Sequence, residues 1–258
     1  MKENLLAIAD ITQPAILAEE KDFLIVYKPP RFHSAPQENS DGGTITEWVI
    51  DKYPETANLD ARKEGEGGLL HRLDFQTHGL LLFARTQHGM KSLLSQQKKG
   101  EIIKGYSALT AAAGNDAEKK LAPGFPNFAP GFPVTSAFRP YGEGRKAVRP
   151  ELVKEFSGAQ KLYTTHLLKM IPIKKTENSF DIVLYQLLIL NGFRHQIRCH
   201  LAWLGRPILN DDLYGGPSYG NGFLGLRAGS LEFYDPSTGR KSNYFLTLLS
   251  LNDICSAK

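Results

Sequence analysis

The amino-acid sequence predicts an α+β fold in which strands outnumber helices. Segments with strand patterns follow one another without a regular alternation with helices, which disfavours a doubly wound parallel sheet. The 258 residues include 15 prolines and 24 glycines, and this composition indicates many turns, as in a strand-rich or mixed fold. We expect a single domain over residues 1–258, with a short N-terminal extension at 1–20 and an irregular excursion at about 114–161.

Local patterns place the individual elements. Apolar runs predict strands at residues 23–28, 80–84, 102–112 and 224–233, and a pair of strands at 162–173 and 180–190 that forms a hairpin. Helical spacing of apolar residues predicts helices at 44–53, 86–100 and 195–204. Thr86 is expected to cap the second helix, and Gly100 and Gly205 are expected to end the second and third helices.

The excursion has a different composition from the rest of the chain. It is rich in proline, glycine and charged residues, and Pro140, Gly142, Gly144 and Pro150 interrupt its second half. Such a segment favours a mobile loop over a packed element. The residues from 139 to 161 carry six basic and three acidic side chains, so this loop is a candidate surface for a polyanion.

Composition argues against a disulfide-rich, a zinc-thiolate and a membrane-anchored protein. The net charge of +4 permits a polyanionic partner but does not require one. Cys199 and Cys255 are the two cysteines, which is too few for a disulfide framework or a zinc site built from thiolates. The first residues carry acids and lack a long apolar core, so we expect neither a signal peptide nor a membrane anchor. A cytoplasmic enzyme is the expectation.

The segment LLHRLDFQTHGLLLFAR places one acid, Asp74, between Arg72 and a turn, just before a buried strand. A carboxylate there would lie at the mouth of a rigid sheet, which suits a nucleophile or a general base. Taken alone, however, the segment fits a surface Arg72–Asp74 ion pair better, since isolated pairs of this kind are common and contribute little.

Basic side chains gather in a second segment, LNGFRHQIRCHLAWLGRPILNDDL. Arg194 and Arg198 are four residues apart and share a helix face, with His195 and His200 nearby. Guanidinium groups at a helix N-terminus can bind a phosphate or a carboxylate, but a solvated basic face fits the charges equally well. Metal binding by the two histidines is disfavoured because no third ligand stands at a useful spacing.

A third segment places Lys104 and Tyr106 on one face of a strand. From the residues alone, a half-buried tyrosine beside a lysine whose charged end reaches solvent is the commoner arrangement.

Five segments together resemble one family, the RluA-type RNA pseudouridine synthases. HRLDFQTHGLLLFA resembles the family signature HRLD-x-x-T-S-G-L-L-L-x-A. FLIVYKPP is similar to the first family motif, KGYSA to a K-x-Y-x-A strand, and GFRHQIRCHLAWLGRPILNDDLYGG to the motif G-R-x-H-Q-I-R-x-H-L with its following turn. LGLRAGSLEFYDPSTG is similar to the closing strand, and the five segments stand in the family's order across residues 23–239.

The resemblance implies a fold and a reaction. The fold is a mixed, mostly antiparallel sheet with flanking helices and a catalytic cleft, and the single domain is then the catalytic domain. The reaction isomerises specific uridines in ribosomal or transfer RNA to pseudouridine, with base flipping and with neither a cofactor nor a metal. Structured RNA is the implied partner, and neither a membrane nor a protein partner is implied. The excursion is then expected at the rim of the cleft, where it closes on RNA.

The resemblance also assigns roles to residues. It makes Asp74 the catalytic nucleophile, pairs Arg198 with Asp74, and places Tyr106 against the flipped uracil as a third catalytic residue. Arg72 is expected to fill the gap that the flipped base leaves in the RNA. The remaining residues expected to bind RNA are Lys28, Thr77, Arg194, His195 and Gln196.

Three positions depart from the family pattern. His78 stands where serine is usual, Phe193 stands where arginine is usual, with Arg194 one position late, and Arg227 stands where histidine is usual. These departures motivate an alternative, a catalytically silent relative that binds or folds RNA. The intact Asp74 argues against that alternative. A hydrolase with a second carboxylate is less favoured, since the resemblance gives Asp211, Asp212, Glu232 and Asp235 no catalytic role.

Overall fold

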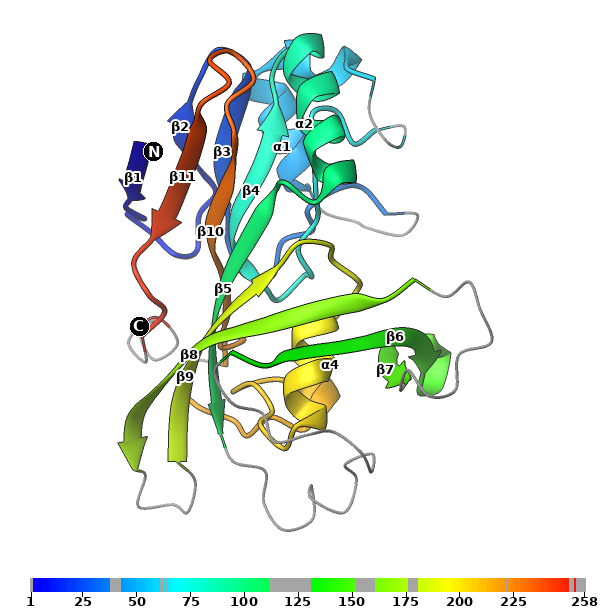
Figure 1. Ribbon diagram of the computed structural model, residues 1–258, viewed down its shortest axis with the longest axis vertical. Helices are drawn as coiled ribbons and strands as arrows, with labels where there is room; N and C mark the ends of the chain where they lie inside the picture. Colours follow the sequence, from blue (N-terminus) through cyan, green and yellow to red (C-terminus); the bar gives the residue numbers. More distant parts are fainter. Residues whose placement is uncertain are drawn as a thin grey trace. The chain divides into compact units, whose positions relative to one another are not determined.

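A computed structural model describes residues 2–37, 43–60, 63, 65–111, 131–151, 161–175, 181–220, 222–250 and 253 (Figure 1). The chain divides into two compact units. Unit 1 comprises Met1–Lys104 and Arg227–Leu248, and unit 2 comprises Gly105–Leu226 and Leu249–Lys258. A single catalytic domain over the whole chain therefore stays a prediction, and each unit is described by itself.

Unit 1 is built on a mixed, mostly antiparallel sheet. Its strands are β1 (Lys2–Leu6), β2 (Ala15–Glu19), β3 (Phe23–Lys28), β4 (His78–Ala84), β10 (Leu226–Tyr234) and β11 (Lys241–Leu246). β3 pairs with β2 and β4 in antiparallel register, and β10 pairs with β11 in the same way. The pairs β4–β10 and β1–β11 are parallel. Three expected strands, β3, β4 and β10, are thus confirmed, and the N-terminal extension contributes two more.

Two strands at the centre of unit 1 are buried along their whole length. Every residue of β3 and β4 is buried, which explains why both read as continuous apolar runs in the sequence. Gly79 at the start of β4 has a φ of +126°, and a Cβ atom there would lie 2.2 Å from the carbonyl oxygen of Ala228. Only glycine allows β4 and β10 to approach so closely.

Two helices of unit 1 begin and end where the sequence predicts. α1 (Ile45–Lys52) has Thr44 as its N-cap, in a capping box with Glu47. α2 (Gln87–Lys99) has Thr86 as its N-cap and ends at Gly100, which adopts a left-handed conformation. A short 3-10 helix, η1 (Pro54–Asn58), follows α1. Buried residues of α2 pack on those of β3 and β4 in one hydrophobic core.

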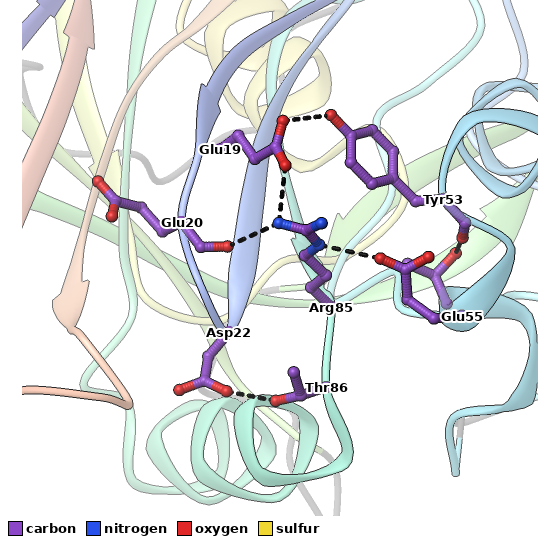
Figure 2. Close-up of polar contacts among 8 residues, drawn as sticks. Glu19, Glu20, Asp22, Tyr53, Glu55, Arg85 and Thr86 are labelled. Atoms are coloured by element: carbon purple, nitrogen blue, oxygen red, sulfur yellow. Dashed lines mark hydrogen bonds and ion pairs between the residues drawn. The ribbon is translucent and has the colours of Figure 1, made fainter.

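Arg85, which directly follows β4, joins three parts of unit 1 (Figure 2). Its guanidinium lies 2.7 Å from the carboxylate of Glu19 on β2 and 2.9 Å from that of Glu55 on η1. Tyr53 donates a hydrogen bond of 2.6 Å to the other oxygen of Glu19. These partly exposed contacts form a network, so they hold the end of β4 more firmly than one surface ion pair would.

In its described residues, unit 2 contains a sheet, in which β6, β7, β8 and β9 pair in antiparallel register, and the helix α4. Its strands stand in the order β5 (Ile103–Ala111), β9 (Asp181–Ile189), β8 (Tyr163–Lys175), β6 (Pro133–Tyr141) and β7 (Ala147–Glu151). α4 (Gln196–Trp203) packs on β7 and β8, and two 3-10 turns, η2 (Glu143–Arg145) and η4 (Asp212–Tyr214), complete the described part of the unit. The expected hairpin is confirmed as β8–β9, and the expected third helix as α4.

The irregular excursion is a partly wrong prediction. Residues 133–151 form the antiparallel hairpin β6–β7, and β6 also pairs with β8. Proline and glycine suggested a loop, but Pro133 begins a strand, Pro140 lies near the end of one, and Gly142 and Gly144 form the turn between the strands. The parts of the excursion at 114–130 and 152–160 lie outside the described residues.

Candidate active site

Asp74 opens a tight turn that leads into β4. The backbone N–H of Thr77 donates to the carbonyl oxygen of Asp74 at 3.0 Å, so residues 74–77 form a hydrogen-bonded β-turn. Asp74 is half-buried and Phe75 is exposed, whereas Thr77 and every residue of β4 are buried. The turn therefore places a half-buried acid a few residues before a rigid, buried strand.

The segment that follows β3 holds this turn from both sides of Asp74. Ser34 Oγ exchanges two hydrogen bonds of 2.9 Å with the backbone of Leu73, which precedes Asp74. The N–H of Arg31 donates to the carbonyl oxygen of Phe75, which follows Asp74, at 2.8 Å. The backbone of Asp74 is thus fixed on each side, as a reactive side chain requires. Sequence analysis missed Ser34, because a serine in a loop carries no distinctive signal.

Lys28, at the end of β3, lies beneath the same turn. Its side chain is fully buried, and Nζ donates to the carbonyl oxygens of Pro29 at 2.9 Å and Phe75 at 3.2 Å. Burial lowers the pKa of Lys28 to about 7, and the negative charge of Asp74 acts in the opposite direction. Lys28 Nζ is held by backbone carbonyls, and the predicted RNA contact of Lys28 stays a prediction. Its place gives it a role in supporting the turn.

Two other predicted RNA-binding residues of unit 1 differ in exposure. The side chain of Arg72 is 51% exposed, and its Nη1 lies 3.9 Å from the carboxylate of Glu66. Thr77 is buried, and its contact with RNA stays a prediction. The RNA contact of Arg72 stays a prediction, since its side chain reaches solvent next to Asp74.

Arg198 of α4 forms a buried ion pair within unit 2. Its Nε donates to Asp211 Oδ2 at 2.8 Å and its Nη2 donates to Asp211 Oδ1 at 2.7 Å, a two-pronged contact between two buried side chains. The guanidinium also lies over the ring of Tyr214, 5.4 Å from its centroid. Sequence analysis did not identify Asp211 as a partner, because a pair thirteen residues apart depends on how the turn after α4 folds back.

The other polar residues of α4 are also buried. Gln196 donates to the carbonyl oxygen of Thr164 at 3.0 Å and to Thr165 Oγ1 at 3.1 Å, and its contact with RNA stays a prediction. His200 bonds through its two ring nitrogens to Ser136 and Thr165, each at 2.9 Å. Burial lowers the pKa of His200 to about 3, so the ring is neutral at physiological pH. Gln196 and His200 therefore tie α4 to β6 and β8.

Two of the three departures from the family pattern contact each other. Arg227 on β10 donates through Nε to His78 Nε2 on β4 at 3.1 Å, and both side chains are buried. The two residues are directly opposite in the parallel pairing of these strands. Arg227 also donates to the carbonyl oxygen of Thr247 at 3.3 Å. The two departures are therefore one paired change in the core of unit 1, at the strand that the Asp74 turn enters.

The third departure is explained by the β6–β7 hairpin. The ring of Phe193 stacks on that of Phe138 on β6, with centroids 5.0 Å apart and planes 5° apart. Arg194 donates to the carbonyl oxygens of Arg145 at 2.7 Å and Ala147 at 3.3 Å. The displaced arginine thus holds the turn of the hairpin. Its guanidinium is tied to that turn, and its predicted RNA contact stays untested.

The predicted site residues fall into two groups. Lys28, Arg72, Asp74 and Thr77 belong to unit 1, where they lie on or under the Asp74 turn. The other group, Tyr106, Arg194, His195, Gln196 and Arg198, belongs to unit 2.

Tyr106, His195 and Arg198 lie in unit 2. Tyr106 is buried on β5, and His195 lies 3.2 Å from the hydroxyl of Tyr214. The pairing of Arg198 with Asp74 stays a prediction. In the described part of the chain, no group of three or more His, Cys, Asp and Glu side chains could hold a metal ion.

Comparison with known proteins assigns the family. The model of the RNA pseudouridylate synthase family matches residues 22–203, and the chain belongs to this family. The match includes the Asp74 turn, Tyr106 and the whole of α4. The family resemblance found in the sequence is thereby confirmed.

The relatives agree with this assignment. An uncharacterized RNA pseudouridine synthase, YjbO of Bacillus subtilis (strain 168), is 28% identical over 234 residues, which are 90% of this chain and 72% of that protein. Ribosomal large subunit pseudouridine synthase D of Vibrio vulnificus (strain CMCP6) is 26% identical over 204 residues, which are 78% of this chain. The chain spans about half the length of the latter relative, 52%.

Solved structures confirm the fold. Human RNA Pseudouridylate Synthase Domain Containing 1 is similar with a TM-score of 0.57 and 19% identity, over 98% of this chain and 86% of that one. Human RNA Pseudouridylate Synthase Domain Containing 4 has the same TM-score and identity, over 90% and 88%. The predicted α+β pseudouridine synthase fold is therefore correct. Within the described residues, no helix is long and apolar enough to cross a membrane.

Proposed function

We propose that this chain isomerises specific uridines in ribosomal or transfer RNA to pseudouridine, with Asp74 as the catalytic carboxylate. The observation that carries the proposal is the Asp74 turn. It presents a half-buried acid from a backbone that Ser34 and Arg31 hold on both sides. Membership of the family supplies the reaction class. An enzyme of these RNAs would work in the cytoplasm.

The reaction is an isomerisation without an added atom. The bond between uracil N1 and the ribose C1′ breaks, the base turns, and a bond from C5 to C1′ forms while the hydrogen of C5 is lost and N1 gains one. Asp74 must therefore act on the ribose or on the base as an ionised group. To reach a turn at the mouth of the sheet, the target nucleotide must leave its stack, which costs a few kcal/mol in a duplex and less in a loop.

Lys28 is a buried, titratable group that interacts electrostatically with Asp74. Its amine is fixed by two backbone carbonyls and its pKa of about 7 leaves it partly uncharged at neutral pH. When protonated, Lys28 and the negative charge of Asp74 attract each other. Lys28 is thus a positioning residue, and Asp74 is the residue that meets the substrate.

Arg198 and Tyr106 complete the proposed machinery on the strength of the family resemblance. The Nε–Nη2 edge of Arg198 is bound to Asp211, so a contact with Asp74 would use Nη1 together with the second hydrogen of Nη2. Asp211 would then act as the residue that orients Arg198. Tyr106 would lie against the flipped uracil, where its ring can stack and its hydroxyl can assist the late proton transfer.

The proposal is tested with RNA that lacks the modification. Total RNA from a strain without this protein is incubated with the purified chain, and pseudouridine is mapped by carbodiimide treatment and primer extension. We expect a stop at one or a few uridines of ribosomal or transfer RNA, and no new stop with Asp74→Asn. The activity is rejected if no uridine changes with the unaltered protein. RNA binding without any modification would then favour a catalytically silent relative.

A further inference from the structure

Two aromatic rings stand next to Asp74 and have no role in the proposed chemistry. Phe75 directly follows Asp74 in the turn, and its ring meets that of His33 with centroids 4.7 Å apart and planes 36° apart. We propose that His33 and Phe75 form a platform on which one unpaired nucleobase of the substrate RNA stacks beside Asp74. The inference deepens the proposed function. It rests on that function in one respect, since it takes RNA to be the ligand.

The exposure of Phe75 is the first argument. The side chain of Phe75 is 43% exposed. Tight turns usually contain small or polar residues at such positions. A large apolar ring in such a place is better explained by a ligand than by folding, because its exposed face adds nothing to the core of unit 1. The flat face of a phenyl ring is suited to a nucleobase, and stacking on aromatic side chains is a common way to bind unpaired bases.

The rigidity of the pair is the second argument. The carbonyl oxygen of Phe75 accepts hydrogen bonds from Arg31 N–H at 2.8 Å and from Lys28 Nζ at 3.2 Å. The carbonyl oxygen of His33 accepts from the N–H of Ile45 in the first turn of α1, at 3.0 Å. The side-chain amide of Gln37 lies 3.1 Å from His33 Nδ1 and orients the ring. A platform that is fixed before RNA arrives loses little entropy on binding.

The charges around the pair are the third argument. Arg31 and Arg72 are both exposed, and both lie near Phe75. The N–H of Arg31 donates to the carbonyl oxygen of Phe75, and Arg72 precedes Phe75 by three residues in the chain. The acids in the same place are Asp74 and Glu66, of which Glu66 lies 3.9 Å from Arg72. Aromatic rings with neighbouring cations are the usual surface for single-stranded nucleic acid, because the cations meet the phosphates while the rings meet the bases.

The backbone of Arg31 adds a fourth observation. Its φ of +61° lies in the left-handed region, which a residue with a side chain seldom adopts. Strained conformations of this kind cluster at ligand sites, where the surrounding structure enforces them. Here the strain allows the N–H of Arg31 to reach Phe75 and turns the chain toward His33. The local fold thus maintains the two rings in contact.

Stacking on these rings would not read the sequence. Every base has a flat face, so the platform accepts any unpaired nucleotide. Its effect is to require an unpaired neighbour for the target uridine, which restricts substrates to loops and single strands. The platform is therefore a determinant of RNA structure and not of RNA sequence.

The test separates bases from phosphates. We measure binding by fluorescence anisotropy with a labelled uridine dodecamer and with a dodecamer of the same ribose–phosphate backbone that lacks all bases. The variants are Phe75→Leu, Phe75→Trp and, as a matched control, Tyr234→Leu, since Tyr234 belongs to the same unit and is 41% exposed. We expect Phe75→Leu to weaken binding of the uridine dodecamer about tenfold and to leave the base-free dodecamer unchanged. Phe75→Trp and Tyr234→Leu are expected to bind both as the unaltered protein does.

Several results would overturn the platform. These are equal affinity of the unaltered protein for the two dodecamers, no loss with Phe75→Leu, or the same loss for both dodecamers. Pseudouridine mapping with the same preparations keeps the two proposals apart. Base-dependent loss in Phe75→Leu without any pseudouridine would reject the activity and retain the platform, whereas pseudouridine formation with no effect of Phe75→Leu would do the reverse.

Discussion

The Asp74 turn of unit 1 and helix α4 of unit 2 carry equally distinctive sequence motifs, yet they use their polar residues in opposite ways. The turn exposes Arg72 and Phe75 and leaves Asp74 half-buried. Helix α4 buries Gln196 and Arg198. The residues of the turn thus remain partly accessible, whereas Gln196 and Arg198 of α4 form hydrogen bonds inside unit 2. A distinctive motif alone does not reveal which of these roles its residues have.

The largest effect on stability is expected at α4. Arg198→Ala leaves the buried carboxylate of Asp211 without its two-pronged partner, so the free energy of unfolding in urea should fall by about 3–5 kcal/mol. The double variant Arg198→Met with Asp211→Ala should recover part of the loss because neither charge remains. A loss below about 1 kcal/mol for Arg198→Ala would mean that the pair does not support the fold.

The second effect concerns the paired departures in unit 1. His78→Ser and Arg227→His should each lower the free energy of unfolding by about 1–3 kcal/mol, because each leaves a buried polar partner unsatisfied. The double variant introduces the serine and histidine usual in the family, and it should cost less than the sum of the single changes by about 1 kcal/mol. Additive losses in urea denaturation would show that the two residues do not form one unit.

The third effect is a pH dependence at Lys28. Because its folded pKa of about 7 lies below the ordinary lysine value of about 10.4, the unfolded chain binds more protons between these two values. Stability from this group therefore rises with pH across that window, by up to about 1.4 kcal/mol per pH unit. The unfolding free energy of the unaltered protein relative to Lys28→Met should rise from pH 7 to pH 10. A constant difference would contradict the lowered pKa.

The smallest effect is expected at the β6–β7 hairpin, where Arg145 and Lys146 of the turn and Arg149 of β7 are exposed. Replacing all three with glutamine should flatten the salt dependence of RNA binding, by up to about 2 in the slope of log K against log salt, since each contact with a single strand contributes about 0.7. The fold should be unaffected, because none of the three side chains is buried. An unchanged slope would remove this hairpin from the RNA interface.

Local signals in the sequence were sufficient for the elements that support the Asp74 turn. Helix α2 begins after Thr86 and ends at Gly100 as predicted, since a cap depends on residues within one helical turn. The strand at residues 23–28 was predicted at its full length, because every residue of it is buried. These elements fix the place of Asp74, and the family motif supplied its predicted role.

Long-range contacts account for what the sequence did not reveal. The pair of His78 and Arg227 joins residues 149 positions apart, and only the register of β4 against β10 brings them together. Asp211 meets Arg198 because the chain folds back after α4. The β6–β7 hairpin was missed because its prolines and glycines mark strand ends and a turn as readily as a loop. The burial of Lys28 was also missed, since lysine is seldom buried.

The proposed catalytic role of Asp74 is tested most directly by the rate of pseudouridine formation. Pseudouridine formation on total RNA is measured for Asp74→Asn, with the amount of folded protein and its RNA affinity determined in the same samples. We predict a fall in rate of about a thousandfold or more, which corresponds to about 4 kcal/mol of lost transition-state stabilisation, with the fold and RNA binding nearly unchanged. A rate close to that of the unaltered protein would contradict the assignment of catalysis to Asp74.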